Sequence, residues 1–258
     1  MTGDGWSAAV RRQLGLGRVL PLGGPGDGAW LTESAAAAVL RRAAERVTGA
    51  RLLTVRLALA DPAATAVEVS PDAYVSTVPS PPSALPHHPL RISGDVAADA
   101  TEPLPVAAAR LRTVLAAAAA DRLGLVVAEV DLRVTALLDG TTDGAAAGAS
   151  AAPGAVPDAV GPTEPGPEPP ADDEDRVARA ALAVPGVTRL TGALGGLGRA
   201  VHIEERPSLN SLPRRHVRLE LAVSTDHRAL DVTRAVRTAV GTSLPDRPSV
   251  AVLVTAVD

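Results

Sequence analysis

The sequence predicts an α+β fold of two tandem small modules, each with helices on one side of a three- or four-stranded sheet. Three observations support this prediction. The chain has 258 residues and is 46% hydrophobic, which is enough for one large domain or two of ordinary size. Short motifs recur in the same order in its two halves. A stretch rich in Gly, Pro, Ala and acids separates the recurrences, and without a periodic apolar face it cannot form a packed core.

The recurrence begins with VTGARLLTVRL (47–57) and VPGVTRLTGAL (184–194), which align without gaps. Order and spacing together are difficult to attribute to a biased composition, so the sequence predicts an internal duplication. The further matches follow in the same order: SALPHHPLRI (83–92) on NSLPRRHVRL (210–219), Asp99 on Asp226, Arg112-Thr113 on Arg237-Thr238 after a two-residue gap, and Asp121-Arg122 on Asp246-Arg247.

The duplication sets the expected domain boundaries. We expect a first module with an N-terminal hairpin over residues 1–139, a disordered linker over 140–175 and a second module over 176–258. The linker carries acids and no Arg, whereas the second module is rich in Arg. We therefore expect the linker to compete with anionic partners for those arginines.

The first elements expected are an amphipathic turn in WSAAVRRQL and a Gly-rich hairpin in RVLPLGGPGDGAWLT, both docking on the first module. Each module then opens with a helix, at about 32–47 and about 174–184. Thr32, or Asp172 and Asp173, are the expected N-caps, because short polar side chains accept the free amide bonds of a first turn.

Strands follow each opening helix. We expect two short strands at 51–59 and 65–69, and their counterparts at 188–194 and 199–204. In HVRLELAVS, Val217, Leu219, Leu221 and Val223 alternate with Arg218, Glu220 and Ser224, which predicts a half-buried strand.

The last two elements of the second module are also readable. The helix DVTRAVRTAVGTSL has an apolar stripe from Val232 to Leu244, with Arg234 and Arg237 largely opposite it. The strand SVAVLVTAV is apolar on both faces, which predicts a central position in the sheet.

Composition excludes several classes of protein. The absence of Cys excludes disulfides, Cys-ligated zinc and iron–sulfur clusters. Trp6, Trp30 and Tyr74 are the only aromatic residues, so base-stacking platforms are not expected. Every basic residue is Arg and Ala is abundant, which indicates GC-rich coding and an actinobacterial source. The longest apolar run, LAAAAA at 115–120, is too short to cross a bilayer, and the N-terminus is unlike a signal peptide, so we expect a cytoplasmic protein.

The helix–VPGV–strand opening, the late Arg-bearing helix and the Val-rich last strand resemble the alkaline shock protein family, the bacterial envelope stress response proteins. WLTESAAAAVLRRAAERVTGARL and RVARAALAVPGVTRL are similar to that family's opening helix and turn. The resemblance implies a soluble, non-enzymatic protein that self-associates and can be held at the cytoplasmic face of the membrane by a separate anchor protein. It transfers no catalytic residues. The duplication, the acidic linker and the Pro-rich loop at 70–89 depart from the family.

Two histidines suggest a metal site, but the internal alignment argues against one. His87 and His88 could seed a site that His202, His216 and His227 complete. However, His87 and His88 align with Arg214 and Arg215, which indicates solvent-facing polar positions. Structural zinc also needs four converging ligands, so we expect no metal and no cofactor.

Two motifs suggest other chemistry. Asp226-His227, beside Ser224 and Thr225, has the residue types of a hydrolase, but triad members seldom sit consecutively, so we expect Thr225 or Asp226, and likewise Asp99, to cap the following helix. GALGGLGRA (192–200) lacks the phosphate-binding patterns and predicts a flexible hairpin. Its GxxG resembles that of RNA-binding KH modules, where the loop joins two helices rather than strands.

The resulting functional hypothesis is a non-enzymatic scaffold or interaction protein of the envelope stress type. It would bind protein partners, an anchor protein among them, and itself near the inner face of the membrane. The alternative is a nucleic-acid-binding protein that uses the Arg-rich second module, and an enzyme ranks third for want of a converging acid–base set. The candidate partner-binding residues are Arg214, Arg215, Arg234 and Arg237.

Overall fold

The computed structural model describes residues 15–63, 78–81, 84–138, 172–193, 199–206 and 214–258. The described residues form both α-helices and β-strands, which agrees with the α+β class. The helices are α2 (Glu33–Ala44), α3 (Leu104–Ala117), its π-helical continuation η2 (Ala118–Leu123), α4 (Asp173–Leu182) and α5 (Ala229–Ser243). The strands are β1 (Val19–Leu22), β2 (Ala29–Thr32), β3 (Ala50–Leu52), β4 (Arg56–Leu59), β5 (Leu90–Asp99), β6 (Val127–Leu138), β7 (Val187–Leu190), β8 (Val201–Arg206), β9 (Arg214–Val223) and β10 (Ser249–Val257).

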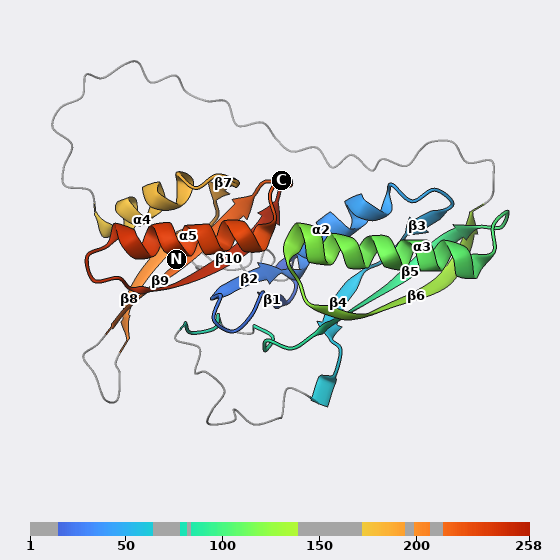
Figure 1. Cartoon of the computed structure of the whole chain (residues 1–258), viewed down its shortest axis with the longest axis horizontal. Helices are drawn as coiled ribbons and strands as arrows, with labels where there is room; N and C mark the ends of the chain where they lie inside the picture. The colour runs from blue at the N-terminus through green and yellow to red at the C-terminus, as the bar shows by residue number, and fades with distance from the viewer. Residues whose placement is uncertain (1–14, 64–77, 82–83, 139–171, 194–198, 207–213) are drawn as a thin grey trace, which may run out of the picture.

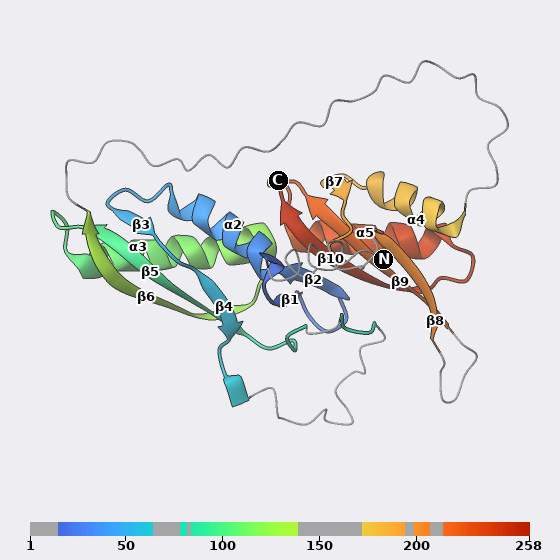
Figure 2. The same cartoon turned by 180° about the vertical axis from the view of Figure 1, so that it is seen from behind.

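The strands form two sheets. One is six-stranded, in the order β1-β2-β10-β9-β7, with β8 also paired to β9. The other is four-stranded, in the order β3-β5-β4, with β6 paired to β5. The helices form a layer above the two sheets, which lie end to end (Figures 1 and 2). One apolar core is continuous between the two sheets and their helices. Within the described residues, no helix is both long and apolar enough to span a membrane.

The same order of elements occurs twice. In the first half (33–138) a helix, two short strands, a long strand, a helix and a last strand follow one another, and the second half (173–257) repeats this order. In both halves the short strands pair antiparallel with the long strand, and the last strand pairs parallel with it. Even an irregularity recurs, because β6 slips register between Val134 and Ala136 as β10 does between Val254 and Ala256.

Strand register corrects the internal sequence alignment. Asp99 donates its amide to Gly49 O at 2.8 Å, and the residue that does the same to Gly186 O is Ser224, also at 2.8 Å. Asp99 therefore corresponds to Ser224, and the expected match with Asp226 is wrong by two residues. The gap belongs in the loop before the long strand, since a loop tolerates a change of length that a strand register does not.

The N-terminal hairpin docks on the opposite half from the one expected. β1 and β2 pair antiparallel, and β2 then pairs parallel with β10, Trp30 facing Leu253. Its strands are fully buried there. The prediction that the hairpin docks on the first module is wrong, because its backbone hydrogen bonds complete the second half's sheet. The central position of β10, between β2 and β9, is confirmed.

The predictions for the opening helices were confirmed, whereas those for the short strands of the first half were confirmed only in part. The opening helices and the Thr32 N-cap are confirmed, the latter by a bond from Ala35 N to Thr32 Oγ1 at 3.4 Å. The single strand expected at 51–59 is instead β3 and β4, because Leu53 N and Thr54 N both donate to Asp95 O and interrupt the pairing. The strand expected at 65–69 and most of the linker lie outside the described residues.

The long strand of the second half is buried on both faces rather than on one. Glu220 is fully buried, and its Oε2 accepts a hydrogen bond from Ala193 N at 2.6 Å. The expected half-buried strand is therefore wrong for β9, because the segment after β7 covers its polar face. The linker boundary also shifts, since α4 begins at Asp173.

Candidate anion-binding cleft between the two halves

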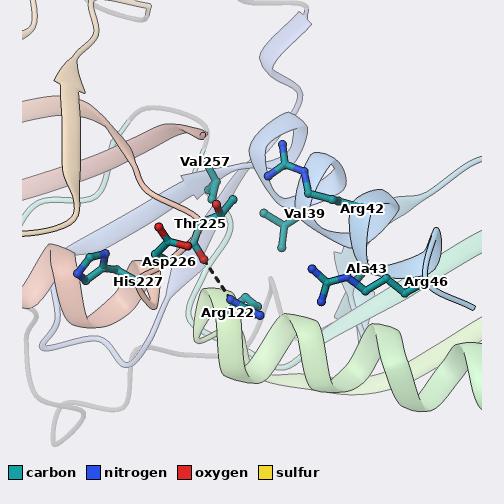
Figure 3. Close-up of a pocket in the computed structure, with 9 residues that line it drawn as sticks. All are labelled: Val39, Arg42, Ala43, Arg46, Arg122, Thr225, Asp226, His227 and Val257. Carbon is teal, nitrogen blue, oxygen red and sulfur yellow. Dashed lines mark hydrogen bonds between the residues drawn. The ribbon is translucent and has the colours of Figure 1, made fainter. Parts of the chain in front are cut away.

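The two halves meet at a small cavity. The end of α2 and η2 of the first half face the β9–α5 turn and the end of β10 in the second half (Figure 3). The cavity has a volume of about 180 Å³. Its lining residues are Val39, Arg42, Ala43, Arg46, Arg122, Thr225, Asp226, His227 and Val257.

Three arginines line this cavity, all from the first half. Arg42 lies in the last turn of α2 and Arg46 in the turn that follows the helix, and both line the cavity. Arg122 comes from η2, and its Nη1 donates to Thr225 O at 3.1 Å across the junction. Arg228 of the second half reciprocates by donating through Nε to Ala120 O at 3.1 Å. The junction is thus held by two reciprocal Arg–carbonyl bonds.

The positive charge of the cleft is largely uncompensated. Within the described residues, Arg42 and Arg46 make neither a side-chain hydrogen bond nor an ion pair, and both are exposed. A helix C-terminus favours cations, so the position of Arg42 in the last turn of α2 is favourable even without a partner. Asp226 is the one acidic residue among those that line the cavity. The cleft therefore has more cationic than anionic groups and can accept an anion.

Asp226 and His227 both line this cleft, as neighbours in the β9–α5 turn. No side-chain hydrogen bond joins them, and Asp226 N donates to Ser224 Oγ at 3.2 Å. His227 packs against Gly186, where an added Cβ would lie 2.9 Å from its Cγ.

The expected helix capping is also wrong. The N-cap residue of α5 is Arg228, without a side-chain cap, and Asp99 accepts from Thr101 N at 2.9 Å instead. Thr225 N is held by Asp258 O at 2.7 Å, which ties the turn to the end of β10 rather than to the helix.

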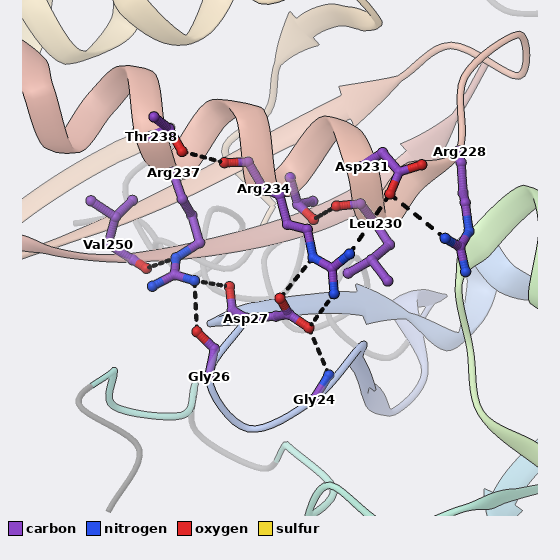
Figure 4. A network of polar contacts seen from close by, with 11 residues as sticks. Gly24, Gly26, Asp27, Arg228, Leu230, Asp231, Arg234, Arg237, Thr238 and Val250 are labelled. Atoms are coloured by element: carbon purple, nitrogen blue, oxygen red, sulfur yellow. Dashed lines mark hydrogen bonds and ion pairs between the residues drawn. The ribbon is translucent and has the colours of Figure 1, made fainter. Parts of the chain in front are cut away.

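Two of the four predicted binding arginines, Arg234 and Arg237, form hydrogen bonds to the loop of the N-terminal hairpin (Figure 4). Arg234 donates to both carboxylate oxygens of Asp27, at 2.8 and 3.0 Å. Arg237 donates through Nε to Val250 O at 3.0 Å and through Nη1 to the carbonyl oxygens of Gly26 and Asp27. The bond from Arg234 holds the pKa of Asp27 below its usual value, while burial lowers the pKa of Arg237.

The other two predicted arginines lie at the start of β9, and the structure does not join them to the first pair. Arg215 forms ion pairs with Asp173 at 2.7 Å and Asp246 at 3.4 Å. Arg214 is exposed. Asp173 belongs to the acidic stretch counted with the linker, and so does Glu174, which pairs with Arg199 at 3.6 Å. Two acids of that stretch therefore pair with second-half arginines.

Arg42, Arg46 and Arg122 were not among the binding residues predicted from the sequence. The sequence did contain a signal for Arg42 and Arg46. They lie four positions apart, about one turn, within the helix expected at 32–47. Nothing local could have found Arg122, because its role depends on the second half lying against η2.

The histidines of the described residues do not lie together as ligands of one metal site. His87 is half-buried and its ring lies edge-on to Trp30, with centroids 6.0 Å apart, so the expected solvent-facing position is wrong. His216 shares a hydrogen bond with Ser249 Oγ at 2.8 Å. Among the described residues no three His, Asp or Glu side chains group as metal ligands would. The Gly-rich segment connects β7 to β8, strands rather than helices, and its residues 194–198 lie outside the described ones.

No protein family model, curated protein or solved structure matches this chain.

Proposed function

We propose that the chain is a tandem pair of alkaline-shock-like modules acting as a non-enzymatic interaction protein, which binds an acidic side chain of a protein partner in the cleft between its halves. The observation that carries this proposal is the convergence of Arg42, Arg46 and Arg122 on one cavity. The repeated order of elements supports the duplication on which the proposal builds.

The size of the cleft favours a side-chain group over a small molecule. Small-molecule sites typically enclose about 300–1,000 Å³. The cleft encloses about 180 Å³, so a carboxylate fits while a nucleotide does not. Guanidinium groups match carboxylates geometrically, because their planar N–H donors can bind both oxygens at once. The ligand expected is therefore an Asp or Glu on the surface of a partner.

Nucleic-acid binding is the competing hypothesis. It would need a broad basic surface, and Arg215, Arg234 and Arg237 are occupied by partners within the chain. An enzymatic function finds no support in the cleft, where no side-chain hydrogen bond joins the described acid and histidine to each other. We further propose that the protein works in the cytoplasm, where an acidic partner can be a membrane anchor protein.

A binding experiment tests the cleft. A fluorescent peptide rich in Glu is titrated into the full chain, and its affinity is measured by anisotropy at several salt concentrations. Replacing Arg42 and Arg46 together by Gln should weaken binding at least about tenfold, because each charge-assisted bond is worth about 1.5–3 kcal/mol. Arg51→Gln is the matched control, since Arg51 is an exposed arginine of the same half that does not line the cleft. Equal affinities for all three proteins would contradict the proposal, and preferential binding of a single-stranded nucleic acid would favour the alternative.

A further inference from the structure

The last strands of the two halves, β10 and β6, differ in how many neighbouring strands they pair with. In the second half, β10 has β9 on one side and β2 on the other. In the first half, β6 has β5 on one side, and no other described strand pairs with it. Because the two halves repeat in register, the edge of β10 shows which backbone groups of β6 face outward and can bond to a further strand.

The correspondence extends to one arginine in each half. Arg112 of α3 donates through Nε to Val130 O at 3.2 Å, as Arg237 of α5 does to Val250 O at 3.0 Å. The two carbonyls are equivalent, because Val130 pairs with Ile92 and Val250 with Val217 at the same point of each sheet. Arg237 then uses Nη1 to hold the backbone that enters β2. Arg112 presents the same group beside β6, where the described residues give it no second partner.

The equivalence also identifies the outward-facing backbone groups. Val252 N donates to Gly28 O of the incoming segment at 3.0 Å, so its counterpart Leu132 directs its N–H away from β5. By alternation along a strand, Val130, Leu132 and Val134 present their backbone groups to the open edge. Their side chains are half-buried, while Glu129, Asp131 and Arg133 lie exposed on the opposite face.

We propose that β6 is the interface of a symmetric dimer, in which β6 of a second copy pairs antiparallel with it about a twofold axis at Leu132. In this register the residues whose backbone groups face the open edge lie opposite one another in the two copies. Leu132 lies opposite Leu132, and Val130 lies opposite Val134 of the second copy. Asp131 then stands directly opposite Arg133 of the second copy, and Arg133 opposite Asp131. A twofold axis at Asp131 would set Asp131 against its own counterpart, although Glu129 would then face Arg133, and an axis at Arg133 would set Arg133 against its own counterpart. With the axis at Leu132 the charged residues that face each other are all of opposite sign, so charge favours this register over those two.

Arg112 is compatible with the pairing. A carbonyl oxygen has two lone pairs, so Val130 O can accept from Arg112 and from the facing strand together. The remaining guanidinium donors of Arg112 then reach the carbonyl groups of the second copy, as those of Arg237 reach Gly26 and Asp27. Charged residues on an edge strand commonly oppose pairing, but here they are self-complementary.

A charge-swap experiment on the full chain tests the dimer. Sedimentation velocity over a wide concentration range should show a monomer–dimer equilibrium for the unmodified chain. Asp131→Arg and Arg133→Asp should each weaken dimerisation by about tenfold or more, because each turns two attractive cross-strand pairs into repulsive ones. The double variant D131R/R133D restores opposite charges across the interface and should recover dimerisation, even though it loses the contact of Asp131 with Arg91 at 3.5 Å; recovery also shows that the altered strand folds.

Arg51→Asp is the matched control. Arg51 lies on β3, which pairs with the edge of β5 away from β6, and is exposed, so the same change of charge there should leave dimerisation unchanged. A monomeric chain at every concentration, or dimerisation that survives both single variants, would overturn the proposal. The cleft experiment measures a different surface, so either proposal can fail without the other.

Discussion

Arg234 and Asp27 form a two-bond ion pair between the C-terminal helix α5 and the loop of the N-terminal hairpin. Asp27 is the better buried of the two, with its side chain 18% exposed against 50% for Arg234. Its Oδ2 also accepts from Gly24 N at 2.7 Å, which shapes the hairpin loop. The ion pair therefore fixes the hairpin to the half of the chain that lies furthest from it in sequence.

Replacing Arg234 by Gln should destabilise the protein by about 0.5–1 kcal/mol, a small value because an ion pair with a half-exposed partner is screened by solvent. Urea unfolding measures the difference. Arg51→Gln is the control, since Arg51 is exposed and forms no ion pair among the described residues, and it should have less effect. An equal loss for Arg51→Gln would refute the assignment.

The same ion pair predicts a pH dependence. The pKa of Asp27 is lowered in the folded state, so its stabilising contribution is complete above the unfolded Asp value of about 3.9 and is lost as pH falls through the lower, folded value. The stability difference between the unmodified chain and Arg234→Gln should therefore shrink as the solution becomes acidic below about pH 4. A difference that stays constant down to complete protonation would show that the pair contributes through packing alone.

Gly49 and Gly186 offer a matched test of the two repeats. Both have positive φ, +74° and +92°. At Gly49 the nearest atom to an added Cβ is 3.5 Å away, so Gly49→Ala should cost only backbone strain, about 1–2 kcal/mol. At Gly186 a Cβ would lie 2.7 Å from Val232 Cγ2, and overpacking should raise the cost of Gly186→Ala to about 2–4 kcal/mol. Thermal unfolding of both variants decides, and equal losses would show that the second site relaxes freely.

His87 and Trp30 predict a second pH effect. Burial lowers the pKa of His87 in the folded state, opposed by the charge of Asp27 and helped by that of His88. A lowered histidine pKa means that the unfolded chain binds the proton first, so stability should fall as pH drops below about 6.5. Trp30 fluorescence in a Trp6→Phe background reports the local change. His87→Gln should remove this part of the pH dependence, and its persistence would assign the effect to another group.

Cleaving the chain at a protease site inserted between residues 140 and 171 should leave two fragments that remain associated. The reason is that β2 of the first fragment pairs with β10 of the second and is fully buried there. Size-exclusion chromatography under native conditions measures the association. Deleting the hairpin, residues 15–32, should weaken the association, because the remaining apolar core and the two Arg–carbonyl bonds of the junction are then all that hold the fragments among the described residues. Separation of fragments that retain the hairpin would instead support modules that fold independently.

Structure that follows from local pattern could be predicted from the sequence. The helix DVTRAVRTAVGTSL (231–244) and the apolar strand β10 were expected within a residue or two of α5 (Ala229–Ser243) and β10, because a 3.6-residue period and a run apolar on both faces are local signals. Recognition of the repeat depended on order and spacing, and it survived an error of two residues in one loop.

What the sequence could not predict depends on contacts between distant segments. The sequence of β2, AWLT, gives no reason for it to pair with β10 rather than with β6. In the structure β2 pairs with β10, and Arg237 donates to the carbonyl oxygen of Asp27 just before β2. Burial of Glu220 required the segment at Ala193 to fold over β9. Arg122 entered the cleft through a bond to Thr225 in the other half. The candidate site lies at a junction between repeats, where the pattern of either repeat alone carries no information.

The pairing of β2 with β10 also constrains how the chain can fold as it is made. Thr32 donates through Oγ1 to Thr255 O, a contact between residues 223 positions apart. At a synthesis rate of about 5–20 residues per second, the hairpin waits at least about ten seconds for the strand that completes its sheet. During that time its apolar strands lack their native neighbour, so this protein should depend more on chaperones than one whose sheets close locally.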